Sequence, residues 1–214
     1  MSSARLLLLA AALVAVGCFP KAPGTSLAHF PDLAPAVGEP APDFRLETAA
    51  GEGVSLQDLV GEKPVVVQLG SHSCPVYRYR RHTMDNLWED YADRVHFVVV
   101  YTTEAHPVGS KSPYSDGEWD PMINKLTGVR VAEPATLDQR RDAAASSKSE
   151  LGLPVPVLID TMDNAVWSAY GEAASPAFVI DLNGEIALSQ PWVYPKEIRA
   201  TLDRLLAESG SSDR

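Results

Sequence analysis

The chain has 214 residues, of which 18 are basic and 28 acidic, for a formal net charge of −10 at pH 7. This length suits one domain with a substantial core. The negative balance argues against nucleic acid as a partner, because phosphate binding requires a positive field.

The N-terminus has the pattern of an export signal. Arg5 precedes the apolar run of residues 6–16, which is shorter than the about 20 residues of a membrane-spanning helix and typical of a secretory signal. Its ending, AVGC, resembles a bacterial lipoprotein box, which is cleaved before the cysteine. We therefore expect residues 1–18 to be a signal ending at Cys18, whose lipid would anchor an exported domain to a membrane, facing the periplasm or the outside. An ordinary signal cleaved a few residues later is the alternative.

The rest of the chain divides into three parts. Residues 19–38 are rich in proline and show little periodicity, so they predict an extended tether. Residues 39–208 carry the regular apolar patterns of a folded domain. Residues 209–214 predict a disordered tail.

Residues 43–101 read as strands around one helix. DFRLET at 43–48 alternates as a strand, AAGEG is a turn, and residues 54–63 form a short helical or loop stretch. PVVVQLG at 64–70 and RVHFVVVY at 94–101 are typical of strands buried on both faces. Between them, Pro75 suits the first turn of a helix. The apolar face of that helix consists of Met84, Leu87, Trp88 and Tyr91.

The second half alternates in the same way. A polar loop at 102–135 precedes a helix at 136–152, which Thr136 caps and Gly152 ends. A buried strand at 155–160, a helix at 161–171, a hairpin at 177–190 turning at Asn183-Gly184, and a final amphipathic helix follow. This order predicts an α/β thioredoxin-like fold, with a central mixed β-sheet and helices on both faces. Pro176 precedes a strand where thioredoxin folds place a cis-proline facing the active-site cysteine, which marks Ser175 and Pro176 as substrate-binding candidates.

Cys74 is the candidate nucleophile. It lies between a buried strand and a helix that starts with Pro75. Unpaired N–H groups and the positive end of the helix dipole favour a thiolate there, and Arg78 would add positive charge. We therefore expect a lowered pKa for the Cys74 thiol. The alternative is an inert cysteine packed in the core.

Polar side chains are expected beside Cys74. The C-terminal ends of parallel strands meet at one edge of an α/β sheet, so the loop with Glu104 and His106 should lie next to the Cys74 loop. His106 could serve as an acid or hydrogen-bond donor, oriented by Glu104. His72, two residues before Cys74, could point into the same loop.

Three segments resemble, in order, motifs of the iodothyronine deiodinase family and its bacterial relatives. The segments are VVVQLGSHSCPVY at 65–77, HFVVVYTTEAHP at 96–107 and VLIDTMDNAVWSAYG at 157–171. The family motifs are a Gly-Ser-x-x-Sec/Cys-Pro-Pro-Phe turn, a Tyr-Ile-x-Glu-Ala-His-Pro strand end and an Asp-Thr-Met-x-Asn…Ser-Ala-Tyr-Gly segment. The resemblance runs from about Glu39 to Leu206.

The resemblance implies site roles. Cys74 takes the place of the catalytic selenocysteine, Glu104 and His106 match the pair beside it, and Tyr101 matches the tyrosine at the strand end. With Ser175 and Pro176, the candidates for substrate binding also include Ser71, His72 and Tyr101. In that family a chalcogenolate attacks iodine on an aromatic ring, and an external thiol regenerates the enzyme. The chain departs from the pattern in having His72 where many relatives have a helper cysteine, no histidine near Pro134, and no arginine in SQPWVYP.

Three functions follow as hypotheses. The first is a single-cysteine oxidoreductase of deiodinase type, acting on a small molecule with an external thiol reductant and no bound cofactor or metal. The second is a one-cysteine peroxidase, because Ser71 stands three residues before Cys74, as in peroxiredoxins. The third is a tethered metal or partner binder, with Cys74 and His72 or His106 as soft-metal ligands. A disulfide reductase is disfavoured, since no Cys-x-x-Cys motif supplies a resolving thiol.

Overall fold

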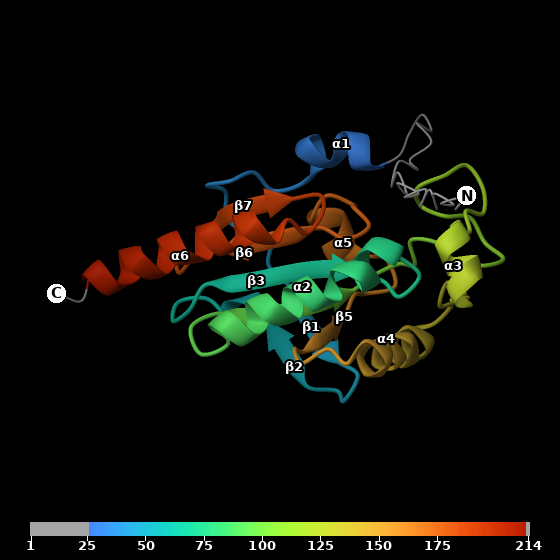
Figure 1. Cartoon of the computed structure of the whole chain (residues 1–214), viewed down its shortest axis with the longest axis horizontal. Helices are drawn as coiled ribbons and strands as arrows, with labels where there is room; N and C mark the ends of the chain where they lie inside the picture. The colour runs from blue at the N-terminus through green and yellow to red at the C-terminus, as the bar shows by residue number, and fades with distance from the viewer. Residues whose placement is uncertain (1–25, 213–214) are drawn as a thin grey trace, which may run out of the picture.

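A computed structural model of the chain describes residues 26–212. Its centre is a seven-stranded mixed sheet with the strand order β2-β1-β5-β4-β3-β6-β7 (Figure 1). The predicted thioredoxin-like arrangement is confirmed. The signal sequence and Cys18 lie outside the described residues. No helix within 26–212 is long and apolar enough to cross a membrane.

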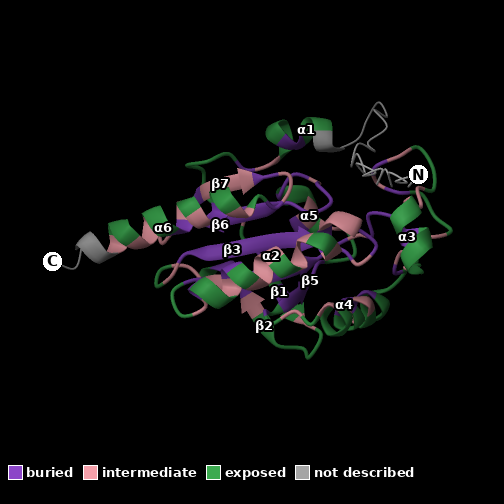
Figure 2. Cartoon of the chain, viewed as in Figure 1, coloured by how far each residue is buried: buried purple, intermediate pink, exposed green. Residues whose placement is uncertain are grey.

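Three parallel strands form the middle of the sheet. They are β3 (Val65–Gly70), β4 (His96–Tyr101) and β5 (Val157–Ile159), and β3 pairs with β4 along its whole length. The antiparallel neighbours are β1 (Arg45–Thr48), β2 (Gly53–Ser55), β6 (Ala177–Ile180) and β7 (Ile186–Gln190). Every residue of β3 is buried (Figure 2), because helices cover the sheet on both faces.

Alternate residues of the central strands face two separate cores. On one face, Val66 and Val99 pack with side chains from α2 (Pro75–Tyr91), α4 (Leu137–Leu151) and α6 (Pro195–Ser212), and Cys74 belongs to this core. On the other face, Val67 and Val100 pack with α1 (Ser26–Leu33) and α5 (Ala165–Ala169), and with the 3₁₀ turn η1 (Leu56–Asp58). The period-2 alternation of a strand produces this division.

The helix signals in the sequence operate as expected at α4. The Thr136 side chain accepts a hydrogen bond from the Gln139 N–H at 3.2 Å, and Gly152 ends the helix with a φ of 59°. A hydroxyl at the N-cap and a glycine in the left-handed region satisfy the free backbone groups at the two ends.

Three segments differ from the predictions. The expected tether contains α1, because Phe30 packs against Phe178 with ring centroids 6.2 Å apart. The expected loop contains α3 (Met122–Thr127), and α6 continues to Ser212 into the expected tail.

The prediction of a cis bond before Pro176 is wrong: no peptide bond within the described residues is cis. Trans is the lower-energy form of an X–Pro bond.

Candidate active site

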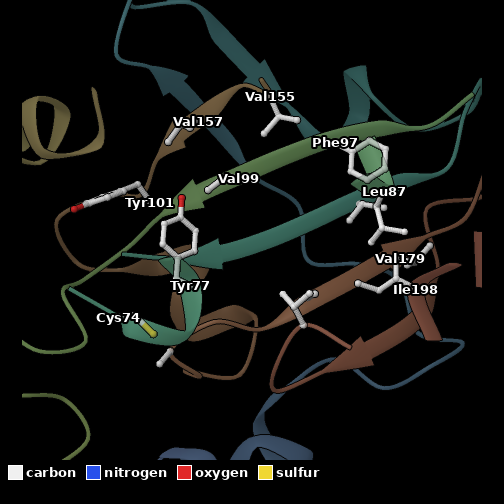
Figure 3. Close-up of a cluster of buried hydrophobic side chains, with 14 of the residues drawn as sticks. Cys74, Tyr77, Leu87, Phe97, Val99, Tyr101, Val155, Val157, Val179 and Ile198 are labelled. Carbon is white, nitrogen blue, oxygen red and sulfur yellow. The ribbon is translucent and has the colours of Figure 1, made fainter. Parts of the chain in front are cut away.

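Cys74 is the N-cap residue of α2. β3 ends at Gly70, the chain turns so that the Cys74 N–H donates to the Ser71 carbonyl at 3.1 Å, and Pro75 opens the helix. The Cys74 sulfur and the Tyr77 ring both lie in the first turn of α2, beside the end of β3 (Figure 3). A side chain on Gly70 would place its Cβ 2.3 Å from the Tyr77 ring. This close approach explains the glycine that ends the strand.

Burial controls the acidity of Cys74. The residue is 1% exposed, and removal of the thiolate from water raises its pKa to about 11. The N–H groups of Tyr77 and Val76 and the charge of Arg78 oppose this shift without overcoming it. The prediction of a lowered pKa for the Cys74 thiol is therefore wrong.

Glu104 has a buried carboxyl group next to the Cys74 loop. It accepts a 2.9 Å hydrogen bond from the Ser73 N–H and a short one from the Tyr101 hydroxyl. The Tyr101 oxygen in turn accepts from the His72 N–H at 3.4 Å. Desolvation raises the pKa of Glu104, although its hydrogen bonds partly offset this. The arrangement places a carboxyl–phenol pair against the two residues that precede the nucleophile.

His106 is attached to the Cys74 loop through its backbone. Its N–H donates to the Ser73 Oγ at 2.9 Å, while its ring Nδ1 lies 3.2 Å from the Trp119 carbonyl oxygen and the imidazole packs edge-on against the Trp119 ring. The expectation that Glu104 orients this ring is therefore wrong, because the Trp119 carbonyl and ring do so. Burial lowers the pKa of His106 to about 4, so the imidazole is neutral at pH 7.

Ser71 and His72 have different surroundings. The Ser71 Oγ accepts the Ala105 N–H at 3.0 Å, which ties the Cys74 loop to the Glu104 loop. The His72 ring instead faces α4, where Nδ1 lies 3.1 Å from the Ser147 Oγ and Nε2 lies 3.3 Å from Glu150. Burial lowers the pKa of His72, and the charge of Glu150 opposes the shift.

Ser175 and Pro176 precede β6 beside β3. The Pro176 carbonyl accepts the Leu69 N–H at 3.1 Å, so this proline borders the strand that leads to Cys74. Ser175 is fully buried, and its Oγ has no hydrogen-bond partner among residues 26–212. An unpaired buried hydroxyl is costly, and the substrate-binding role of Ser175 stays a prediction.

The buried side chain of Arg140 bonds to several segments near the site. Arg140 in α4 binds the Thr161 carbonyl at 2.6 Å and the Asn164 side chain at 2.7 Å. It also pairs at 3.0 Å with Glu133, which accepts the Glu104 N–H at 2.7 Å. This network connects the Glu104 loop to the segment that follows β5. Sequence reasoning missed Glu133 and Arg140, because a charged helix residue normally faces water.

Asn124 of α3 also belongs to the site and was missed. It is 1% exposed, and its Nδ2 donates to the Ser73 carbonyl at 2.8 Å. Its Oδ1 accepts from Arg78 at 2.6 Å. Within the described residues, no group of three His, Cys, Asp or Glu side chains could hold a metal ion.

A thioredoxin-like sheet with a cysteine at its first parallel strand-to-helix turn defines the class of thioredoxin-fold oxidoreductases. Solved structures show the same fold. An uncharacterized conserved protein from Geobacillus kaustophilus has a TM-score of 0.58 and 21% identity, covering 81% of this chain and 83% of its own. A putative thiol:disulfide interchange protein DsbE from Chlorobium tepidum has a TM-score of 0.56 and 20% identity, covering 81% and 98%.

The family model described as iodothyronine deiodinase matches residues 30–206, and the chain belongs to this family. Thyroxine 5-deiodinase of Gallus gallus is 31% identical over 147 residues, which are 67% of this chain and 52% of that protein. Type I iodothyronine deiodinase of Xenopus laevis is 27% identical over 173 residues, which are 78% of this chain and 63% of that protein. The chain thus spans about half the length of the first of these relatives and less than two-thirds of the second.

Proposed function

We propose that the protein is a thiol-dependent reductive dehalogenase in which Cys74 attacks a halogen on a small aromatic substrate. The observation that carries this proposal is the position of Cys74 at the N-terminus of α2, with the Glu104–Tyr101 pair bonded to the adjacent loop. Membership of the deiodinase family supports the reaction class.

The reaction balances with two equivalents of an external thiol. The Cys74 sulfur bonds to iodine as the carbon–iodine bond breaks, and the carbon takes a proton, so Ar–I and Cys–SH become Ar–H and Cys–S–I. A first thiol displaces iodide to form a mixed disulfide, and a second releases Cys74 as a free thiol. The substrate is reduced and the two external thiols are oxidised to a disulfide.

The surrounding residues supply proton transfer and electrostatic control. The charge of Arg78 lowers the pKa of Cys74 and that of Glu104 raises it, so a proton held on the Glu104 carboxyl favours the thiolate. The raised pKa of Glu104 makes that protonated form accessible. Because Cys74 is 1% exposed, the segments over it must move to admit a substrate.

The substrate we propose is a small haloaromatic rather than an iodothyronine. The relatives are named for thyroxine and iodothyronine. The family pattern, however, has a histidine near position 134 and an arginine in the segment 189–195, and this chain has neither.

Iodide release tests the proposal. The full chain is incubated with an iodinated phenol and dithiothreitol, beside Cys74→Ser and the matched exposed control Leu126→Ala, and iodide is measured. The proposal predicts catalytic release by the wild type and the control, and only background with Cys74→Ser. Equal release by the wild type and Cys74→Ser would exclude Cys74 as the nucleophile.

A one-cysteine peroxidase is the second candidate. Ser71 lies in the turn that holds the Cys74 N–H, and its hydroxyl accepts the Ala105 N–H, which leaves the hydroxyl proton to bind a peroxide. Consumption of hydrogen peroxide by the same samples separates the two reactions. Saturable, Cys74-dependent peroxide turnover without iodide release would favour the peroxidase.

The location and reductant are also proposals. The lipobox-like ending at Cys18 supports a lipid-anchored, exported protein. Labelling of expressed protein with a radioactive fatty acid, compared with Cys18→Ser, tests the anchor. An external thiol is proposed because Cys74 is the one cysteine among the described residues, so no second thiol there could resolve the mixed disulfide.

A further inference from the structure

Helix α3 is attached to the protein in an unusual way. Its three large apolar side chains face solvent: Met122 is 68% exposed, Ile123 47% and Leu126 76%. Figure 2 shows this helix mostly in the colour of exposed residues. Asn124 is 1% exposed and points inward. Apolar burial of the helix's own side chains therefore contributes little to holding α3 in place, and within Met122–Thr127 the buried amide of Asn124 makes the inward contacts.

Both ends of the Asn124 amide contact the Cys74 loop or its helix. The Nδ2 donates to the Ser73 carbonyl at 2.8 Å and the Oδ1 accepts from the Arg78 Nη2 at 2.6 Å. The Arg78 Nη1 donates to the His72 carbonyl at 2.5 Å. One side chain from α3 and one from α2 thus bind the carbonyl groups of the two residues before Cys74.

The geometry points to Asn124 as a positioning residue. Together with Arg78, it keeps residues 72–74 in their buried conformation by bonding them to the segment that contains α3. Release of this contact gives reagents and substrates access to Cys74. This inference rests on the proposed role of Cys74 as the nucleophile, and it adds a control of access that the proposed reaction does not define.

Movement of α3 would affect both the Ser73 carbonyl and Arg78. Ser73 is fully buried, and its carbonyl would lose its Asn124 donor if α3 moved away. The same movement would free Arg78 from one of its two hydrogen-bond acceptors, Asn124, and leave it bound to the His72 carbonyl alone. Local opening of a segment with few apolar contacts requires little free energy compared with global unfolding, so α3 is suited to open while the sheet remains intact.

The test measures alkylation of Cys74 by iodoacetamide from pH 6 to 11 in the full chain, quantified on the Cys74 peptide by mass spectrometry. Asn124→Ala removes both contacts. Arg78→Lys keeps the positive charge but cannot bridge two acceptors with a planar fork. Leu126→Ala, on the exposed face of the same helix, is the matched control. Circular dichroism establishes that each variant is folded.

The inference predicts that Asn124→Ala and Arg78→Lys each accelerate alkylation at least about fivefold, the effect of losing one net hydrogen bond on a local opening equilibrium. Half-maximal alkylation should also move to lower pH, because burial is the main cause of the raised thiol pKa. Leu126→Ala should remain within about twofold of the wild type. If Asn124→Ala does not fold, the Arg78→Lys result decides alone.

A wild-type alkylation rate in folded Asn124→Ala, or equal acceleration by Leu126→Ala, would overturn the inference. Iodide release by the same samples separates its failure from that of the proposed function. Faster alkylation of the variant with no iodide release by the wild type supports the positioning role and contradicts the dehalogenase. If the variant is alkylated at the wild-type rate while the wild type releases iodide, the dehalogenase is supported and the positioning role is contradicted.

Discussion

The Ser73 N–H donates a 2.9 Å hydrogen bond to the buried carboxyl group of Glu104. Since Ser73 immediately precedes Cys74, this bond fixes the carboxyl beside the nucleophile loop. The Tyr101 hydroxyl donates to the other carboxyl oxygen, whereas the His106 Nδ1 lies beside the Trp119 carbonyl. The carboxyl–phenol pair, rather than a carboxyl–histidine pair, is the proton-holding group of the proposed reaction.

Replacement of Glu104 by Gln should remove this proton-holding function with little change of shape. The amide still accepts one hydrogen bond, so the fold is retained, but it cannot exchange a proton with the reacting groups. We expect turnover to fall by about 100-fold, the usual contribution of general acid–base catalysis. Initial rates of iodide release provide the measurement, and a Gln variant with wild-type turnover would exclude the role.

The acidity of Cys74 predicts a pH dependence. Because its pKa is about 11, alkylation should be slow at pH 7 and should increase up to about pH 11 rather than level off near 8.5, where a free cysteine titrates. The thiol holds its proton more tightly in the folded than in the unfolded chain. This contribution to stability is therefore complete below about pH 8.5 and is lost as the pH rises toward 11. A half-maximal alkylation pH at or below about 8.5 would show an open, solvated thiol.

The lowered pKa of His106 predicts that the folded protein loses stability in acid rather than in base. Its pKa is lowered to about 4, so the unfolded chain binds the proton more readily. The stability from its neutral form is present above about pH 6.5 and is lost as the pH falls toward 4, by up to about 3 kcal/mol. His106→Asn should flatten this part of the stability profile in urea unfolding, whereas the exposed control His82→Asn should retain the wild-type slope. Identical profiles for both variants would contradict the burial effect.

Arg140 should be a large contributor to stability. It is 1% exposed and pairs with Glu133 while binding the Thr161 carbonyl. Arg140→Leu removes the hydrogen bonds from this buried guanidinium to the half-buried Glu133 and to the Thr161 carbonyl, and should lower the unfolding free energy by about 1–3 kcal/mol. The adjacent Arg141 forms its ion pairs at the surface, so Arg141→Leu should cost less than about 1 kcal/mol. Equal costs in urea unfolding would contradict the importance of the buried network.

Gly70 should tolerate no side chain. A Cβ there would lie 2.3 Å from the Tyr77 ring, so Gly70→Ala should displace the first turn of α2 and lower the unfolding free energy by about 1–3 kcal/mol. A Cβ on Gly117 would meet no atom of the described residues within 4 Å. Gly117→Ala is therefore the matched control, with an expected change within about 0.5 kcal/mol. Equal thermal stability of the two variants would show that the ring yields without cost.

The sheet and the position of Cys74 were predictable because their signals are local. The β-branched run at Val65–Val67, the proline after Cys74 and the glycine at 152 each determine their own element. The motif resemblance also predicts that Glu104 lies near the nucleophile, as the bond to Ser73 confirms. These features depend on short-range patterns of burial and backbone geometry.

The missed features depend on tertiary contacts. Phe30 stabilises α1 only because Phe178 lies opposite, and the burial of Asn124 requires the Ser73 carbonyl and Arg78 as partners. The direction of the Cys74 pKa shift reverses because desolvation exceeds the effect of the helix N-terminus. Sequence position revealed the favourable dipole, but only the packed structure shows how completely the sulfur is buried.

A mixed disulfide at Cys74 is the intermediate that only the proposed nucleophilic role of this thiol would produce. The protein is mixed with an iodinated phenol and one equivalent of a thiol, quenched with acid, and the peptides containing Cys74 and Cys18 are mapped by mass spectrometry. If Cys74 is the nucleophile, the thiol becomes attached to Cys74 only when the haloaromatic is present, in step with the release of iodide. Iodide release without any adduct on Cys74 would contradict it.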